Sequence, residues 1–251
     1  MEFMIAKLLG FTAVLTRIST FFAVAPVFSW KSIPNTVKVA MTIMVSLFFS
    51  MAAPPPINGE QVRPIEAVLL LCNEAIYGIA LGLIITLVFA AVRFGGRIIE
   101  QQMGLTMAEI LDPLTGESSQ PLGMFMEMMF ILLLLSANGH HLLLLVIARS
   151  YETFPAGSIP TIPILAGGVV KAGSTLMIAG LRLSAPILGA FLLLMVTLAV
   201  LARVAQEMNI LFISLPLRVG LGLLMAGLLF LPFLQGFVTE FADWMAKLLP
   251  I

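Results

Sequence analysis

Charged side chains within long apolar segments constrain the fold of this chain more than any other feature. They are Arg17, Glu74, Glu127, Lys171, Arg182 and Arg218. A guanidinium that faces lipid at the centre of a membrane helix costs about 3 kcal/mol on insertion scales. A single bundle of 251 residues has limited interior in which to shelter such groups. We therefore expect them to be buried against partner subunits or along a hydrated path. Arg203, in the polar stretch after residue 202, is expected to serve the same contacts.

The composition indicates an integral-membrane or membrane-assembled protein. Hydrophobic residues make up 60% of the chain and charged residues 10%, whereas a soluble domain carries about 25% charged residues. The 13 basic residues balance the 13 acidic ones, so the net charge is zero. This balance provides no electrostatic footprint for nucleic acid.

The apolar segments predict an all-α fold of long, partly broken helices. They lie at 3–28, 39–53, 65–92, 122–148, 164–202 and 210–234, and a short amphipathic helix is expected over 236–251. The segment 164–202 is far longer than the ~20 residues that one membrane crossing needs. Its two charges and Pro186 predict a broken helix, or two helices with a tight bend near that proline. The polar run 138–141 predicts a turn or helix break within 122–148.

Gly78 and Gly82 form a GxxxG pair in the segment 65–92. This spacing lets two helices approach closely, so the pair predicts a packing notch within the protein. Glu74, one helical turn earlier, is a candidate partner for a basic group such as Arg17. The sequence leaves that pairing open.

The stretch 103–121 cannot plausibly form a helix in lipid and predicts an ordered, irregular loop. It holds three acidic residues, two prolines and two glycines; proline stiffens the backbone and glycine loosens it. An aqueous connector is the commoner kind of loop. Four apolar residues within the stretch favour a re-entrant piece that lines a protein-enclosed path: Leu105, Met107, Ile110 and Leu111. Met107 and Ile110 are three residues apart, so one helical turn would place both on one face.

No residues form a recognisable catalytic, cofactor or metal site. Cys72 is the single cysteine and is expected to be a small buried apolar residue. His140 and His141 would point about 100° apart on a helix, so they do not form a chelating face. No stretch matches a phosphate-cradling loop or a nucleophile with its base. We therefore expect no enzyme, no cofactor and no metal ion.

Several short motifs, in their order and spacing, resemble the FliR family of flagellar type III export-gate proteins, and more distantly its injectisome counterparts. The motifs are Arg17 with APVF at 25–28, Pro34 with Lys38, Glu74 with Gly78 and Gly82, GLTMAEILDP at 104–113, NGHH at 138–141, APIL at 185–188, AR at 202–203, MNI at 208–210 and PLR at 216–218. Together they are spread over nearly the whole chain. NGHH and the central Asp-Pro look more flagellar than injectisome-like.

The resemblance implies one subunit of a helical export-gate assembly. A FliP-like part over 1–163 would be followed by a FliQ-like part over 164–251. FliP-type and FliQ-type subunits would complete a channel for unfolded flagellar polypeptides, and an FlhB-type protein would wrap it. An FlhA-type protein and the flagellar basal body are further expected partners, in the bacterial inner membrane.

The resemblance also implies that the central loop projects into the pore and helps to close it. The implied plug residues are Gly104, Leu105, Met107, Ile110, Leu111, Asp112 and Pro113. Family members often hold aromatic residues where this chain has Met107 and Ile110, which would instead fill a constriction by dispersion contacts. Gln206 and Glu207 replace the family's common Pro-Gln, which adds a negative charge.

A secondary transporter of small molecules or ions is the alternative. Broken helices and intramembrane charges also suit such proteins. A transporter is expected to purify by itself and to contain inverted repeats, and the sequence holds no clear repeat. A gate subunit is expected to co-purify with two other small membrane proteins.

Overall fold

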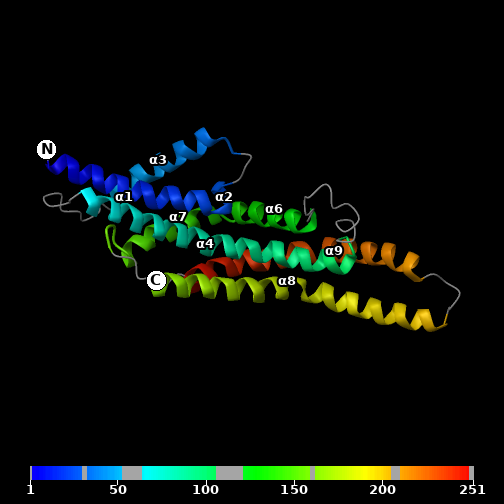
Figure 1. Cartoon of the computed structure of the whole chain (residues 1–251). Helices are drawn as coiled ribbons and strands as arrows, with labels where there is room; N and C mark the ends of the chain where they lie inside the picture. Colours follow the sequence, from blue (N-terminus) through cyan, green and yellow to red (C-terminus); the bar gives the residue numbers. More distant parts are fainter. Residues whose placement is uncertain are drawn as a thin grey trace, which may run out of the picture. The chain divides into compact units, whose positions relative to one another are not determined.

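The computed structural model describes residues 2–29, 33–52, 64–105, 121–158, 162–204 and 210–248, and within these ranges every regular element is a helix (Figure 1). The helices are α1 (Glu2–Val24), α2 (Pro26–Ser29), α3 (Asn35–Ala52), α4 (Pro64–Met103), α6 (Pro121–Ser136), α7 (Gly139–Thr153), α8 (Ile162–Val204) and α9 (Ile210–Leu248). Stretches long and apolar enough to cross a membrane are Lys7–Val24, Pro64–Met103 and Ile162–Val204. The prediction of an all-α membrane fold is confirmed.

The chain divides into two compact units that interleave in sequence. The first comprises Met1–Val88, Asn138–Gly173 and Phe241–Ile251, and the second comprises Phe89–Ala137 and Ser174–Glu240. α4, α8 and α9 therefore each contribute to both units. The expected division at residue 163 into FliP-like and FliQ-like parts describes which subunits each part resembles, not which residues are in contact. The two compact units therefore do not test it, and it stays a prediction.

α4 continues well past residue 92, where the apolar segment ends. Its last turns expose Arg93, Arg97 and Gln101, which lie four residues apart along one face. Ile99 and Met103 are buried on the other side of the same turns. This alternation with the helical period is that of an amphipathic surface helix. The polar residues after 92 therefore extend the helix rather than end it.

The predicted break in 164–202 is wrong, because α8 is one continuous helix that passes through Pro186. α9 likewise passes through Pro216 and Pro232, so the tail after residue 236 continues α9 instead of forming a separate helix. A proline removes one intrahelical hydrogen bond. In apolar surroundings the other backbone groups still gain most by keeping their helical partners.

The predicted break over 138–141 is confirmed. α6 ends at Ser136 and α7 begins at Gly139. Between them Asn138 has a φ of 59°, in the left-handed region. Asparagine tolerates this conformation better than most residues do.

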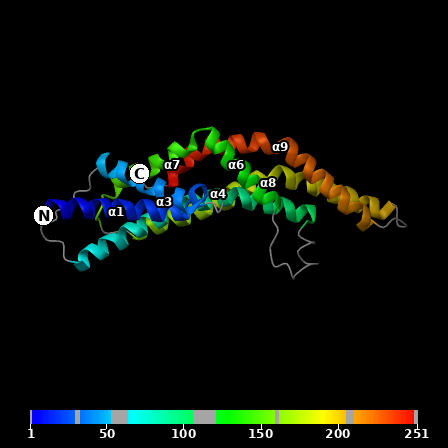
Figure 2. The ribbon, with the colours of Figure 1, turned by 90° about the horizontal axis from the view of Figure 1, so that it is seen from above.

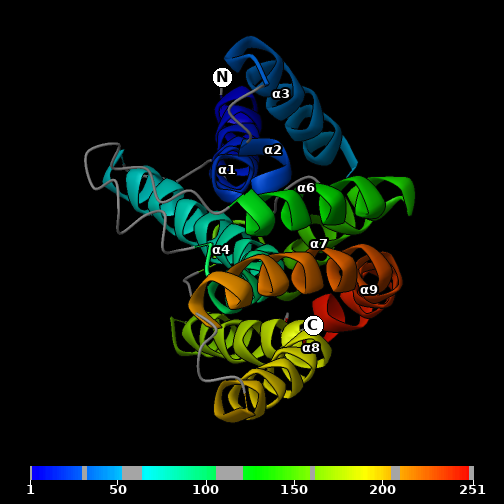
Figure 3. The same ribbon diagram turned by 90° about the vertical axis from the view of Figure 1, so that its right-hand side faces the viewer.

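In the first unit, α1 approaches the first half of α4 closely at the two glycines of the GxxxG pair. A Cβ atom at Gly78 would lie 2.0 Å from Thr20 Oγ1 and 2.3 Å from the carbonyl oxygen of Arg17. A Cβ atom at Gly82 would lie 2.8 Å from Val24 Cβ. α3 lies against α1, as Figure 2 and Figure 3 show. The missing Cβ atoms therefore set the distance between α1 and α4.

In the second unit, small residues bring the end of α4 against α6 and α9. A Cβ atom at Gly96 would lie 2.6 Å from the Cα atom of Gly123 in α6. A Cβ atom at Gly222 in α9 would lie 2.5 Å from Met103 Cγ. The last turns of α4 are thus held on two sides.

α8 has a broadly uncovered apolar surface. In its most apolar window 17% of the residues are buried, compared with 56% in α4. Its exposed side chains include Val170, Met177, Leu193 and Val200. A contiguous apolar surface of this kind marks contact with lipid or with a partner chain.

Replacing Gly78 by alanine is expected to destabilise the first unit. The added Cβ atom would force α1 away from α4, and overpacking of this kind costs about 1–3 kcal/mol. Gly167→Ala is the matched control, because Gly167 also lies in a helix and a Cβ atom there would meet nothing within 4 Å. The control should be neutral or up to about 1 kcal/mol more stable, since alanine favours helix. Thermal unfolding in detergent measures both, and equal midpoints for the two variants would contradict the close approach.

Candidate functional site

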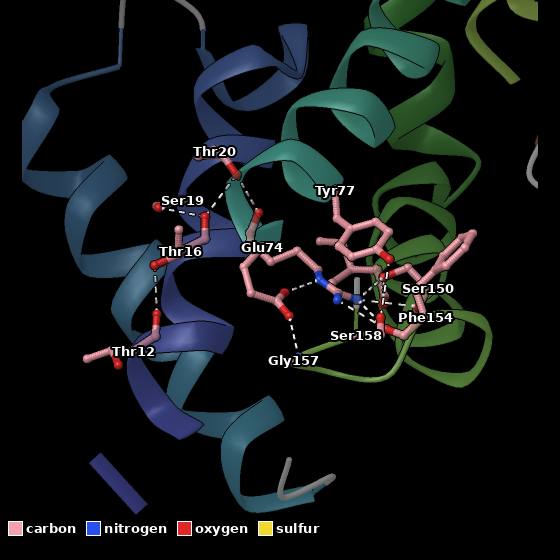
Figure 4. Close-up of polar contacts among 12 residues, drawn as sticks. Thr12, Thr16, Ser19, Thr20, Glu74, Tyr77, Ser150, Phe154, Gly157 and Ser158 are labelled. Carbon is pink, nitrogen blue, oxygen red and sulfur yellow. Dashed lines mark hydrogen bonds and ion pairs between the residues drawn. The ribbon is translucent and has the colours of Figure 1, made fainter. Parts of the chain in front are cut away.

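Arg17 and Glu74 form a fully buried ion pair in the first unit (Figure 4). Arg17 projects from α1, and its Nε donates a hydrogen bond to Oε2 of Glu74, in α4, at 2.6 Å. The two side chains are 1% and 0% exposed. The pairing that the sequence left open is therefore made within the chain.

The same guanidinium binds the carboxyl end of α7. Nη1 donates to the carbonyl oxygens of Ser150 and Phe154, at 3.4 and 3.0 Å, and to Ser150 Oγ at 3.3 Å. Nη2 donates to the Phe154 carbonyl oxygen at 3.0 Å. Carbonyl groups at the end of a helix lack helical partners and carry partial negative charge. The Ser150 carbonyl also accepts the Phe154 N–H at 2.9 Å, so Arg17 adds a second donor there and bonds the Phe154 carbonyl beyond it. Both carbonyl groups stabilise the positive charge of Arg17.

Glu74 ties the segment after α7 to the same cluster. Its second oxygen, Oε1, accepts a hydrogen bond from the Gly157 N–H at 2.9 Å. Gly157 has a φ of 89°, a conformation that glycine adopts without steric cost. Both carboxylate oxygens therefore have a partner. The ion pair joins α1, α4 and the chain that follows α7.

Two tyrosine rings lie beside the guanidinium. The Cζ atom of Arg17 is 4.1 Å from the ring centroid of Tyr151 and 4.8 Å from that of Tyr77, within the range of cation–π attraction. The Tyr77 hydroxyl lies 3.2 Å from Ser158 Oγ, and its ring packs on Phe154 with centroids 5.0 Å apart. This aromatic cover lowers the local dielectric and strengthens the ion pair.

The Arg17 cluster is built to hold helices together rather than to carry out chemistry. A buried ion pair repays its loss of hydration only when further hydrogen bonds satisfy both partners. Here all three guanidinium nitrogens and both carboxylate oxygens have such bonds. With both side chains closed to solvent, a reacting group would have no access to them.

Glu127 pairs with Arg93 in the second unit. Arg93 Nε donates to Glu127 Oε2 at 2.7 Å, and Nη2 donates to the same oxygen. The Arg93 side chain is 49% exposed and that of Glu127 is 12% exposed, so solvent screens the pair from the arginine side. The pair links α4 to α6.

The other charged candidates lie nearer the surface of the chain. Lys171, Arg182 and Arg203 in α8 are exposed. Nη1 of Arg182 lies 3.5 Å from Oε2 of Glu240, between two largely exposed side chains, and such pairs contribute little stability. Arg218 is half-buried, and its Nε has no hydrogen-bond partner within the described ranges. A role for these residues in subunit contacts stays a prediction.

The structure describes only the first two of the expected plug residues, Gly104 and Leu105. Gly104 directly follows α4 and has a φ of 80°, and its N–H donates to the Gln101 carbonyl at 3.2 Å. Leu105 follows and is 37% exposed. The remaining plug residues lie outside the described residues: Met107, Ile110, Leu111, Asp112 and Pro113. Gln206 and Glu207 do so as well.

Among the residues that the structure describes, no three His, Cys, Asp or Glu side chains gather as metal ligands. The rings of His140 and His141 lie against each other, with centroids 4.2 Å apart. Cys72 is exposed, so the expectation of a buried cysteine is wrong. It lies on the outward face of α4, one turn before the exposed Ile76. An apolar run in sequence does not reveal which face of a helix is covered.

The sequence did not predict that Tyr77 and Tyr151 cover the Arg17 cluster, or that Arg93 is the ion-pair partner of Glu127. Tyr77 lies three residues after Glu74, one turn along the same helix, and this spacing could have been noticed. Tyr151 and Arg93 carry no such signal, because their partners lie on other helices.

A profile of known proteins described as "Bacterial export proteins, family 1" matches residues 8–244. The chain belongs to this family. It is 33% identical over 242 residues to the flagellar biosynthetic protein FliR of Pectobacterium carotovorum subsp. carotovorum, covering 95% of this chain and 90% of the relative. It is 33% identical to FliR of Escherichia coli (strain K12) over 94% of this chain and 90% of that protein. It is 31% identical to FliR of Bacillus subtilis (strain 168) over 86% and 84%.

Membership of this export family confirms the resemblance that the motifs indicated. Together with the apolar helices, it makes the chain a membrane-embedded component of flagellar export. The motif residues Arg17 and Glu74 contribute the buried ion pair, so that part of the family pattern has a structural explanation.

Removing either member of the buried pair is expected to destabilise the chain strongly. Arg17→Met or Glu74→Met leaves an uncompensated buried charge, which costs about 3–5 kcal/mol. The double variant should lose less than the sum of the two, because no isolated charge remains. Arg182→Met is the control, since an exposed pair is worth about 0–1 kcal/mol.

Denaturant unfolding in detergent compares the four variants. Single variants at position 17 or 74 that lose no more stability than the Arg182 control would contradict the central role of the pair.

Proposed function

We propose that this chain is one subunit of the flagellar export gate, in the bacterial inner membrane within the basal body. FliP-type and FliQ-type subunits would complete a channel with it, and unfolded flagellar polypeptides would pass through that channel. An FlhB-type protein would wrap the assembly, with an FlhA-type protein nearby. The observation that carries the proposal is the family match over residues 8–244 together with relatives that are flagellar biosynthetic proteins.

The surface of α8 supports a partner-bound state. This helix exposes apolar side chains along its length and also exposes Arg182 and Arg203. Lipid would cover the apolar residues well, but a lipid-facing arginine is unfavourable by about 3 kcal/mol. A protein partner can cover both kinds of side chain at once. Arg218, with its buried and unpartnered Nε, fits the same explanation within the described part of α9.

The two-part origin of the chain belongs to the same proposal. Residues 1–163 would take the place of a FliP-like subunit and residues 164–251 that of a FliQ-like hairpin. That α8 and α9 are two long helices that follow each other in sequence supports this proposal. One chain would then occupy two neighbouring positions in the helical assembly.

The central loop is proposed to act as a passive plug. Met107 and Ile110 would fill the constriction by dispersion contacts at rest, and the loop would move aside for an extended polypeptide. The energy for transport would come from other components, and this chain would carry no enzymatic activity or cofactor. The alternative of a secondary transporter is not favoured by relatives that are flagellar proteins.

Deleting residues 104–113 is expected to raise ion leakage in cells that carry the assembled gate, because the plug would be missing. Leakage is measured as the decay of an ion gradient across the inner membrane. Replacing Ser118 and Ser119 by alanine is the control within the same loop, since it leaves the apolar residues in place. Unchanged leakage from a deletion variant that still assembles would remove the plug role.

Co-expression with FliP-type and FliQ-type proteins tests the assembly itself. We expect one stable complex containing all three chains, because the exposed surface of α8 would be covered in it. Native mass measurement gives the composition. A chain that purifies alone as a stable monomer, and ignores both partners, would contradict the proposal.

A further inference from the structure

Glu100 is a buried acidic residue in the last turn of α4, with 1% of its surface exposed. Its Oε1 accepts a hydrogen bond from the Gly123 N–H at 3.2 Å and another from the Leu122 N–H. Both donors belong to the first turn of α6. A side chain of one helix therefore satisfies the start of another.

The first turn of α6 needs such an acceptor. The first four N–H groups of a helix have no helical partner. α6 begins at Pro121, which has no N–H and suits the first helical position. The next two residues, Leu122 and Gly123, supply the donors that Glu100 accepts. A carboxylate also interacts favourably with the positive end of the helix dipole.

Glu100 is the last of three successive contacts between α4 and α6. Arg93 pairs with Glu127, and Gly96 lies against Gly123. From Arg93 to Glu100 along α4, the contact residues run back along α6 from Glu127 to Gly123 and Leu122. The two helices are therefore antiparallel, and the contacts hold them together up to the turn where α4 ends.

Packing alone does not account for a carboxylate at this position. The other oxygen, Oε2, is buried and has no hydrogen-bond partner in the part of the chain that the structure describes. Burying an acceptor without a partner is unfavourable. An apolar side chain of similar size would fill the same volume without that penalty, so the carboxylate contributes through its bonds to α6.

We propose that Glu100 is a positioning residue that caps α6 from the end of α4. It thereby sets the separation of the two points between which residues 106–120 run. The cap itself follows from the contacts of Glu100, whereas its importance for leakage rests on the proposed plug function.

Hydrogen exchange of the first turn of α6 tests the cap directly. The full chain, co-purified with its FliP-type and FliQ-type partners, is compared with Glu100→Leu, Glu100→Gln and Gln101→Ala. Leucine keeps the volume but offers no acceptor, so the rate of amide exchange at residues 122 and 123 should rise. The expected rise is at least about tenfold, which corresponds to the loss of a hydrogen bond to a charged group. Glutamine keeps an acceptor oxygen and should give a smaller rise.

Gln101→Ala is the matched control, because Gln101 is the next residue of α4 and its side chain is exposed. This substitution should leave exchange at residues 122 and 123 unchanged. If Glu100→Leu does not assemble, Glu100→Asp replaces it; its carboxylate is one methylene shorter and should lose the same bonds. Unchanged exchange in the leucine variant, or a rise in the glutamine variant as large as in leucine, would overturn the cap.

Ion leakage through the assembled gate separates this inference from the proposed function. We expect Glu100→Leu to raise leakage in the same direction as deletion of residues 104–113. Leakage from the deletion but not from Glu100→Leu would overturn the positioning role. If the deletion itself leaves leakage unchanged while exchange still rises, the plug function fails and the cap stands.

Discussion

The first unit of this protein is arranged around the buried guanidinium group of Arg17. Arg17 could not remain in an apolar helix without a counter-charge, and Glu74 alone would not satisfy all of its donors. The remaining donors use the end of α7. The close approach of α1 to α4, which the missing Cβ atom of Gly78 allows, places the two side chains within reach of each other. Charge, hydrogen bonds and helix spacing thus support one arrangement.

The charges in the apolar segments divide into two groups. Arg17 and Glu74 neutralise each other inside the chain, so partner subunits are not needed to shelter them. Arg182 is exposed on α8 and lies 3.5 Å from the largely exposed Glu240. Arg203, just after the same apolar segment, is exposed as well. Hydropathy does not distinguish the two groups, because it shows that a charge lies in an apolar run but not which way the charged side chain points. The distinction separates residues that fold the chain from candidates for assembly.

Hydropathy was sufficient to predict the helices and the membrane class, because apolar length is a local property. It failed where tertiary context decided the outcome. α8 continues through Pro186, and the polar end of α4 stays helical because its other face is buried. The ion pair was a candidate from sequence, since two opposite charges in apolar runs need partners. The bonds of Arg17 to carbonyl groups and of Glu100 to N–H groups could not be predicted, because backbone groups have no sequence signature.

The span of sequence joined by Arg17 has a consequence for synthesis. Its hydrogen bonds reach Phe154, 137 residues later. At a translation rate of 5–20 residues per second, roughly 7–27 s separate the emergence of the two residues from the ribosome. During that interval the nascent first helix carries a cation whose final acceptors do not yet exist. Until then, Arg17 must be stabilised by water, an insertion factor or anionic lipid. The completed fold no longer needs this temporary shelter.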